Sequence, residues 1–227
     1  MKKDEITNAK ILSLCDHTLL KPSATSEQIR KAVKEAGELG CASVCIPPSY
    51  VKEAHLFSKE KVKICTVIGF PTGYQTTEVK VFEAKAALCD GADEIDMVAN
   101  IGWIKDGKYE KVLDEINAVK ASVGEKTLKV IIETSELTRE EKIKMAEIVS
   151  KSNADYIKTS TGFSSMGATP DDIALLSEHM SGGKGIKASG GISSLEDARE
   201  LIMLGATRLG TSKIVNLIKK QTDNGGN

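Results

Sequence analysis

The sequence of 227 residues lacks any apolar run near the roughly 18 residues that a membrane-spanning helix needs. Residues 1–5 include two lysines, but no apolar segment of the kind found in secretory signals follows them. An excess of charge is also missing, because 31 Lys and Arg residues stand against 32 Asp and Glu residues. No overall field therefore draws the chain to nucleic acid or to an anionic membrane. We expect neither as a partner, and we expect a cytoplasmic location.

Metal-binding patterns are also missing from the cysteines and histidines. The five cysteines are Cys15, Cys41, Cys45, Cys65 and Cys89. They show no CxxC spacing, and their odd number argues against a disulfide scaffold, so buried free thiols are the simplest interpretation. The three histidines, His17, His55 and His179, lie on separate segments. We therefore expect no metal cofactor.

What the sequence does contain is a regular alternation of strand-like and helix-like segments. The eight strand candidates are residues 12–18, 43–46, 62–69, 94–99, 129–134, 156–160, 185–189 and 208–211. No linker, low-complexity stretch or charge block divides the chain, so we expect one domain over residues 1–227. The polar end, residues 221–227, is expected to be frayed.

The segments between the strands carry helix signals. Capping-box pairs are Thr25 with Gln28, Thr138 with Glu141, and Ser193 with Glu196; Thr169-Pro170 is a further start signal, and Gly40, Gly91 and Gly205 are stop signals. Val112, Ile116 and Val119 form a one-sided apolar stripe, as in helices that cover a sheet. Eight β-then-α units with short loops predict an α/β fold, a single (β/α)8 TIM barrel. A doubly wound open sheet is the competing architecture.

Two lysines interrupt the apolar strand candidates: Lys158 within residues 156–160 and Lys187 within residues 185–189. Lysine is rarely buried, so two in consecutive strands suggest a function. A neutral amine is needed to attack a carbonyl and form a Schiff base, and burial or a neighbouring cation favours that neutral form. The pair is therefore interpreted as a nucleophile and its activator, although a single strand lysine could also be an edge residue whose charge reaches solvent.

Two carboxylates occupy comparable places in the strand candidates, Asp16 in the first and Asp96 within residues 94–98. Because active residues of barrels lie at the carboxyl ends of strands, these acids are expected near the two lysines. Together the four charges would form two ion pairs and could shuttle protons. Purely structural roles, a cap for Asp16 and a buried partner for Asp96, remain open.

Small residues at three strand ends suggest a phosphate site. Gly162 follows the sixth strand candidate, Gly190-Gly191 the seventh, and Gly210 the eighth. Such residues let backbone N–H groups approach an anion, and a helix N-terminus after Gly191 would add positive potential. Glycine pairs are also ordinary in turns.

Five motifs closely resemble those of the deoxyribose-phosphate aldolase family. They are YIKTSTGF at 156–163, GIKASGG at 185–191, DHTLLKP at 16–22, VIGFP at 67–71 and EIDMV at 94–98. The resemblance extends over nearly the whole chain. It implies a metal-free class I aldolase on a TIM barrel. Such an enzyme reversibly cleaves 2-deoxy-D-ribose 5-phosphate to acetaldehyde and D-glyceraldehyde 3-phosphate in deoxynucleoside catabolism. A homodimer is plausible by the same analogy.

Carried over by position, the resemblance makes Lys158 the Schiff-base nucleophile and Lys187 its activating neighbour, with Asp96 as acid and base and Asp16 as support. The residues that it assigns to substrate or phosphate are Thr18, Cys45, Thr159, Gly162, Gly190, Gly191, Gly210 and Ser212. The chain departs from some members in two places. Phe163 stands where they have a lysine, and residues 222–227 contain no tyrosine.

Three other functions remain open at this point. One is a different class I aldolase or transaldolase, which would not accept acetaldehyde as donor. Another is a phosphosugar isomerase, which would form no borohydride-reducible adduct. The third is a barrel that only binds phosphorylated metabolites.

Overall fold

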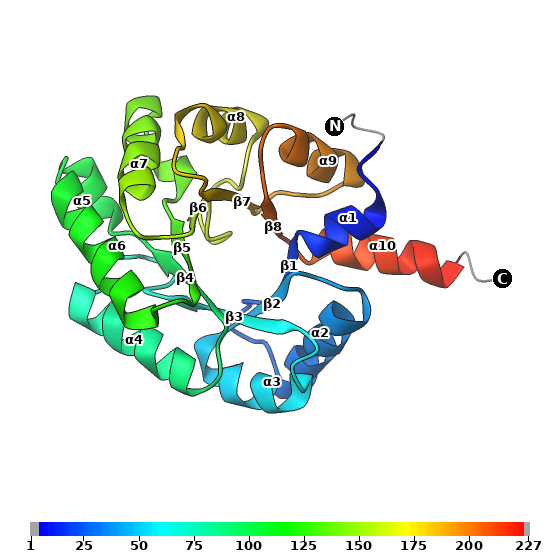
Figure 1. The fold of residues 1–227 in the computed structure, drawn as a ribbon. Helices are drawn as coiled ribbons and strands as arrows, with labels where there is room; N and C mark the ends of the chain where they lie inside the picture. Colours follow the sequence, from blue (N-terminus) through cyan, green and yellow to red (C-terminus); the bar gives the residue numbers. More distant parts are fainter. Residues whose placement is uncertain (1–4, 225–227) are drawn as a thin grey trace.

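The computed structural model describes residues 5–224 and consists of a closed parallel barrel surrounded by helices (Figure 1). The strands are β1 (Cys15–Thr18), β2 (Ser43–Ile46), β3 (Lys63–Ile68), β4 (Glu94–Val98), β5 (Thr127–Ile131), β6 (Tyr156–Lys158), β7 (Gly185–Ser189) and β8 (Arg208–Gly210). Each strand pairs with the next, and β8 pairs with β1, which closes the sheet. The predicted barrel is confirmed, and the open-sheet alternative is wrong.

Helices on the outside connect the strands (Figure 1). They are α1 (Asn8–Ser13), α2 (Ser26–Glu38), η2 (Pro48–Tyr50), α3 (Val51–Ser58), α4 (Thr77–Cys89), α5 (Ile101–Lys105), α6 (Tyr109–Val123), η3 (Thr134–Glu136), α7 (Arg139–Lys151), α8 (Pro170–His179), α9 (Leu195–Met203) and α10 (Lys213–Asn224). The capping boxes at Thr25 and Thr138 are present, and Thr169 caps α8 ahead of Pro170. These local signals fix where the helices start, and hence how the loops leave the barrel.

Strand residues alternate between two different environments. Outward-facing side chains such as Val44, Ile95 and Val130 belong to the main apolar core, which lies between the barrel and its helices. The barrel interior is different, because its apolar cluster is limited to Cys45, Cys65 and Val67 with a few neighbours. The rest of that interior is largely polar, and this polarity positions the candidate site.

Several sequence-based boundaries need correction, among them the end of the sixth strand, which lies at Lys158 and not at residue 160. Leu12 belongs to α1, so the first strand starts only at Cys15. The fifth strand spans Thr127–Ile131, so it starts two residues and ends three residues earlier than predicted. The third capping box uses Ser194 and Asp197, one residue beyond the predicted pair. Helix α10 continues to Asn224, so residues 221–224 are helical, while 225–227 lie outside the described residues.

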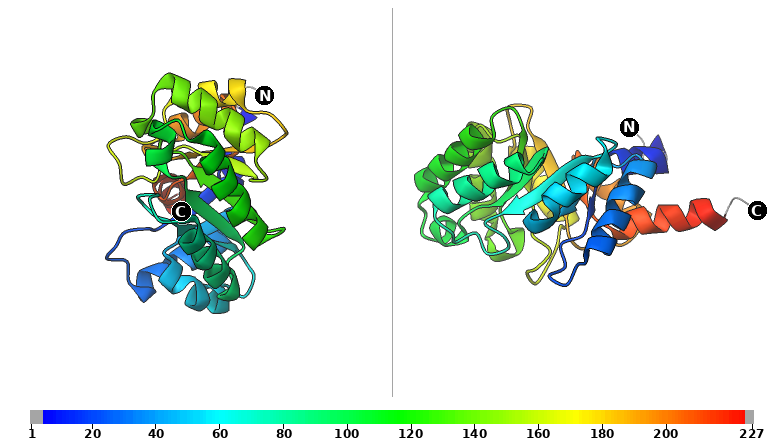
Figure 2. Two further views of the ribbon diagram at one scale, coloured as in Figure 1. Left: turned by 90° about the vertical axis from the view of Figure 1, so that its left-hand side faces the viewer. Right: turned by 90° about the horizontal axis from the view of Figure 1, so that it is seen from below.

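The loops after β1 and β6 extend from the same end of the barrel (Figure 2, right). This is the end at which the strands have their carboxyl termini, where barrels carry their active sites. Within residues 5–224, no helix combines the length and apolar character needed to cross a bilayer.

Candidate active site

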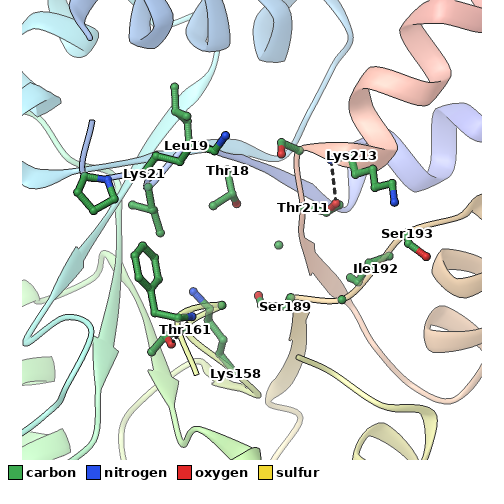
Figure 3. Close-up of a pocket in the computed structure, with 18 residues that line it drawn as sticks. Thr18, Leu19, Lys21, Lys158, Thr161, Ser189, Ile192, Ser193, Thr211 and Lys213 are labelled. Carbon is green, nitrogen blue, oxygen red and sulfur yellow. Dashed lines mark hydrogen bonds between the residues drawn. The ribbon is translucent and has the colours of Figure 1, made fainter. Parts of the chain in front are cut away.

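A pocket with a volume of about 560 Å³ opens at the carboxyl ends of the strands. This size suits a small metabolite. Figure 3 shows the pocket, with the Lys158 ammonium directed toward its open centre. The lining residues come from the ends of β1, β6, β7 and β8 and from the loops after them. The one buried lysine of the lining is thus presented to a bound molecule.

Lys158 and Lys187 meet at one carboxylate oxygen. They are register partners on β6 and β7. The Nζ atom of Lys158 lies 2.8 Å from Oδ2 of Asp96, and the Nζ atom of Lys187 lies 2.6 Å from the same oxygen. Lys187 also donates a hydrogen bond to Asp16. The structure therefore brings together all four residues predicted to be catalytic.

A third buried lysine, Lys129, belongs to the same cluster and was missed by the sequence analysis. Its ammonium lies 2.9 Å from Oδ1 of Asp96, 2.6 Å from Oε2 of Glu94 and 3.4 Å from Sγ of Cys65. The sequence does contain a signal for it, because Lys129 is a charged residue within the apolar run Thr127–Ile131, as Lys158 is within its own strand. The predicted strand began at Lys129, so this lysine fell at a strand end, where a charge needs no explanation.

The ionic cluster is larger than the two ion pairs predicted. Arg208 on β8 reaches Oδ1 of Asp16 at 2.7 Å and Oε1 of Glu94 at 3.2 Å. Three carboxylates, Asp16, Glu94 and Asp96, therefore share the barrel interior with four cations, Lys129, Lys158, Lys187 and Arg208.

One cation is thus in excess if every group is ionised. Lys63 also comes within 3.8 Å of Glu94, but its side chain is 62% exposed, so water screens its charge. Among the four interior cations, Lys158 is the one that lines the pocket. Without the charge of Lys158, the three carboxylates would be balanced by the three remaining cations, Lys129, Lys187 and Arg208.

The electrostatics keep Asp96 and Lys187 charged. Burial opposes ionisation of Asp96, but Lys129, Lys158 and Lys187 outweigh it and hold its pKa well below the usual range. Burial likewise opposes the charged form of Lys187, and the carboxylates of Asp16 and Asp96 raise its pKa above the usual range. These groups remain ionised at neutral pH.

The predicted phosphate residues mostly line the pocket. Thr18, Gly162, Gly190, Gly191, Gly210 and Ser212 all contribute to its wall. Gly162, Gly190 and Gly191 have positive φ angles of 83°, 76° and 73°, which explains why glycine is needed there. At Gly210 the constraint is space, since an added Cβ would come within 2.2 Å of Oγ of Ser189 and 3.1 Å of Cε of Lys187.

Two predicted substrate residues lie away from this pocket. The hydroxyl of Thr159 is buried, donating to the carbonyl of Ser189 and accepting from its N–H, so it joins β6 to β7. Cys45 is buried against Cys65, its register partner on β3. Neither side chain is among those that line the pocket.

Two groups of side chains offer three possible metal ligands within 4.8 Å of one another. They are Cys45, Cys65 and Asp96, and Asp16, Cys65 and Glu94. Every carboxylate in these groups already accepts a hydrogen bond or ion pair from a buried lysine or from Arg208. A metal cation would have to displace those positive groups, which the donor set does not favour.

Phe163 forms part of the pocket wall where some family members have a lysine. Its ring packs edge-to-face on Phe70 with centroids 5.2 Å apart. Thr161, two residues before Phe163, donates from its N–H and hydroxyl to the buried carboxylate of Glu133. Glu133 has a left-handed backbone with φ 51°, and burial raises the pKa of its carboxyl group. Strain of this kind is often concentrated at functional sites.

A closed eight-stranded parallel barrel with an accessible, carboxylate-paired lysine at its mouth defines a class of protein suited to Schiff-base chemistry on small carbonyl compounds. The model of the DeoC/LacD family aldolases matches residues 10–210. The chain belongs to this family.

Curated relatives and solved structures agree with this assignment. The chain is 54% identical over 211 residues to deoxyribose-phosphate aldolase of Clostridioides difficile, covering 93% of this chain and 96% of the relative. It is 52% identical over 220 residues to the enzyme of that name from Clostridium botulinum, covering 97% and 100%. The tetrameric deoxyribose phosphate aldolase of Aeropyrum pernix superimposes with a TM-score of 0.85 at 32% identity, covering 96% of this chain and 93% of that chain.

Proposed function

We propose that this chain reversibly cleaves 2-deoxy-D-ribose 5-phosphate to acetaldehyde and D-glyceraldehyde 3-phosphate through an imine on Lys158. The observation that carries the proposal is the position of Lys158, whose amine faces the pocket while Asp96 holds it at 2.8 Å. The family and its relatives support an aldolase acting on this substrate.

The first steps form the electron sink. The neutral amine of Lys158 adds to C1 of the open-chain sugar, and the resulting carbinolamine loses water to give a protonated imine. The C3 hydroxyl then gives up its proton, and the C2–C3 bond breaks with its electrons moving into the imine. D-glyceraldehyde 3-phosphate leaves, and an enamine of acetaldehyde remains on Lys158.

The last steps regenerate the amine. The enamine takes a proton at C2, water adds to the new imine, and acetaldehyde departs. The cationic imine accepts the electron pair itself, so the chemistry requires no metal ion.

Asp96 is proposed as the group that accepts and returns protons near Lys158. Its Oδ2 atom is shared by the ammonium groups of Lys158 and Lys187 at 2.8 and 2.6 Å. When Lys158 becomes an imine, that oxygen lies beside the atoms that exchange protons, directly or through one water. Lys187, charged and fixed by Asp16, would favour the neutral form of Lys158, and Asp16 would act by holding Lys187 in place.

The substrate phosphate is proposed to bind at the glycine-rich wall. Among the residues that line the pocket there is no aspartate or glutamate, whereas Lys21, Lys158 and Lys213 are present. Gly162, Gly190, Gly191, Gly210 and Ser212 would surround the anion. Thr18 lies across the pocket from Ile192 and Ser193 (Figure 3). Helices α9 and α10 start beside this wall, so their N-termini add positive potential.

Assembly and location are further proposals. The chain is proposed to act as one domain, since Lys219 of α10 pairs with Glu35 of α2 at 2.8 Å and so joins the last helix to the first barrel unit. A homodimer is proposed by analogy, and the Aeropyrum pernix relative is a tetramer. Light scattering of the purified protein would decide between these states. A cytoplasmic location is proposed because the thiols are free.

The proposal is tested by borohydride reduction in the presence of 2-deoxyribose 5-phosphate, followed by peptide mass mapping. A reduced adduct on Lys158, absent from Lys158→Ala, is expected. An adduct on Lys187 would reverse the roles of the two lysines. No adduct despite phosphate binding would favour an isomerase or a binding protein, and failure with acetaldehyde as donor would favour a different aldolase.

A further inference from the structure

One wall of the pocket is built by two consecutive strand-to-helix turns. Residues 190–193 follow β7 and residues 211–213 follow β8, and both groups line the pocket. Lys213 is the first residue of α10, and its N–H donates to the hydroxyl of Thr211 at 3.1 Å. Figure 3 shows Lys213 beside Ser193 on this wall, across the pocket from Lys21. The backbone of Lys213 is thus fixed while its side chain remains at the rim.

The ammonium of Lys213 has no hydrogen bond or ion pair with any side chain that the structure describes, although many other lysines of the chain have one. The same pocket lining contains no carboxylate that could neutralise it. Its positive charge is therefore available to a ligand.

The other two cations of the pocket are less suited to a phosphate at this wall. Lys158 must be neutral to attack the carbonyl, and its ammonium form is held by Asp96. Lys21 lies on the loop after β1, on the other side of the pocket from Ile192 and Ser193 (Figure 3). Lys213 lies on the side where the glycine turns and the N-termini of α9 and α10 converge.

We propose that Lys213 is the specificity-determining cation of this site, which contacts the substrate phosphate and sets the preference for phosphorylated over unphosphorylated sugars. The inference rests on the proposed aldolase function. A lysine binds phosphate as a point charge, and its contact supplements the directional N–H groups of the turns. The family resemblance assigns the neighbouring Ser212, and not Lys213, to the substrate phosphate.

The test compares Lys213→Gln with two matched variants. Lys21→Gln removes a charge from the opposite wall, and Lys220→Gln removes an exposed charge from the same helix outside the pocket. The measured quantity is kcat/KM for 2-deoxyribose 5-phosphate divided by kcat/KM for 2-deoxyribose. We expect this ratio to fall about tenfold in Lys213→Gln, as befits one charged contact at an exposed position. We expect it to fall much less in Lys21→Gln and to stay constant in Lys220→Gln.

An equal fall in Lys213→Gln and Lys21→Gln would overturn the proposal in favour of a general field, and an unchanged ratio in Lys213→Gln would overturn it outright. A second measurement does not depend on turnover: binding of inorganic phosphate, followed by the thermal shift that it produces. Weaker binding in Lys213→Gln alone supports the assignment even if the chain is not an aldolase. Equal binding in all variants contradicts it even if borohydride traps the Lys158 adduct.

Discussion

Lys158 and Lys187 face each other in register on β6 and β7, and both donate a hydrogen bond to the same oxygen of Asp96. The two amines therefore compete for one negative charge. Lys187 has a second carboxylate, Asp16, whereas the other side of Lys158 is the pocket. The arrangement makes Lys187 the better-compensated cation and leaves Lys158 as the lysine of the pair that a bound molecule can reach.

Replacing Lys187 by leucine should slow imine formation at neutral pH. Without the competing ammonium, Asp96 and Asp16 would favour the protonated form of Lys158, so the rise of the imine-forming rate with pH should move to higher pH. Each unit of displacement corresponds to about a tenfold loss at neutral pH. Pre-steady-state trapping with borohydride across a pH series measures this displacement. In Lys187→Arg, which keeps the charge, the pH profile of the imine-forming rate should move less. An unchanged pH profile in Lys187→Leu would exclude the activating role.

Replacing Lys129 by methionine should destabilise the fold. Glu94 and Asp96 would lose a buried partner, and removing one member of a buried ion pair costs about 3–5 kcal/mol of unfolding free energy. Urea unfolding of the variant measures the cost. Lys126→Met is the matched control, because its exposed pair with Asp93 should contribute less than about 1 kcal/mol. Equal effects of the two substitutions would show that the interior cluster is better solvated than the structure indicates.

Gly210→Ala tests the close packing beneath the pocket. The new methyl group would overlap Ser189 and press on Lys187, at 2.2 and 3.1 Å. We expect a loss of about 1–3 kcal/mol of unfolding free energy from overpacking. A fall in kcat of at least about tenfold should accompany it as Lys187 shifts. Gly37→Ala in α2 is the control, since its nearest neighbour would be Cβ of Lys61 at 3.6 Å. At Gly37 we expect the unfolding free energy to increase by about 0.5–1 kcal/mol. A similar increase in Gly210→Ala would refute the packing argument.

Glu133 should make the stability of the protein depend on pH. Burial raises the pKa of its carboxyl group above the usual 4.5. A carboxyl group with a raised pKa binds its proton more tightly in the folded state, so its contribution to stability is largest at low pH and falls as the pH rises above 4.5. Relative to Glu133→Gln, the wild type should therefore lose unfolding free energy with rising pH, at no more than about 1.4 kcal/mol per pH unit. Urea titrations at several pH values measure the unfolding free energy of the wild type minus that of Glu133→Gln, with Glu178→Gln as an exposed control. If the wild type instead gains stability over Glu133→Gln as the pH rises, the carboxylate is stabilised by its bonds to Thr161.

Much of the fold could be predicted because local and global signals agree. Capping residues such as Thr25 and Thr138 mark helix starts independently of any tertiary contact, and the apolar strands alternate with them at regular intervals. The predicted strand boundaries were wrong where the apolar pattern is ambiguous. Leu12 is buried in a short helix that directly precedes β1, and an apolar residue there resembles the start of the strand.

The site was predictable where the chemistry is unusual for the local structure. A lysine inside an apolar strand is unusual enough to indicate a function, which is why Lys158 and Lys187 could be found from the sequence. Arg208 could not be found in this way, because its role depends on β8 closing against β1 and bringing it to Asp16. Thr159 illustrates the opposite case, since only the register of β6 and β7 shows that its hydroxyl is used between strands.

Removal of metal ions should leave the activity intact. The imine itself accepts the electrons of the broken bond, and the possible ligands Cys45, Cys65 and Asp96 lie beside the ammonium groups of Lys129 and Lys187, which oppose a bound cation. After dialysis against EDTA, the rate of cleavage of 2-deoxyribose 5-phosphate should stay within about twofold of its original value, well under 1 kcal/mol of activation free energy. Elemental analysis of the dialysed protein provides the control. The opposite result would be a loss of activity after dialysis that added zinc reverses in the wild type but not in Cys65→Ser. That result would place a metal ion among these three residues.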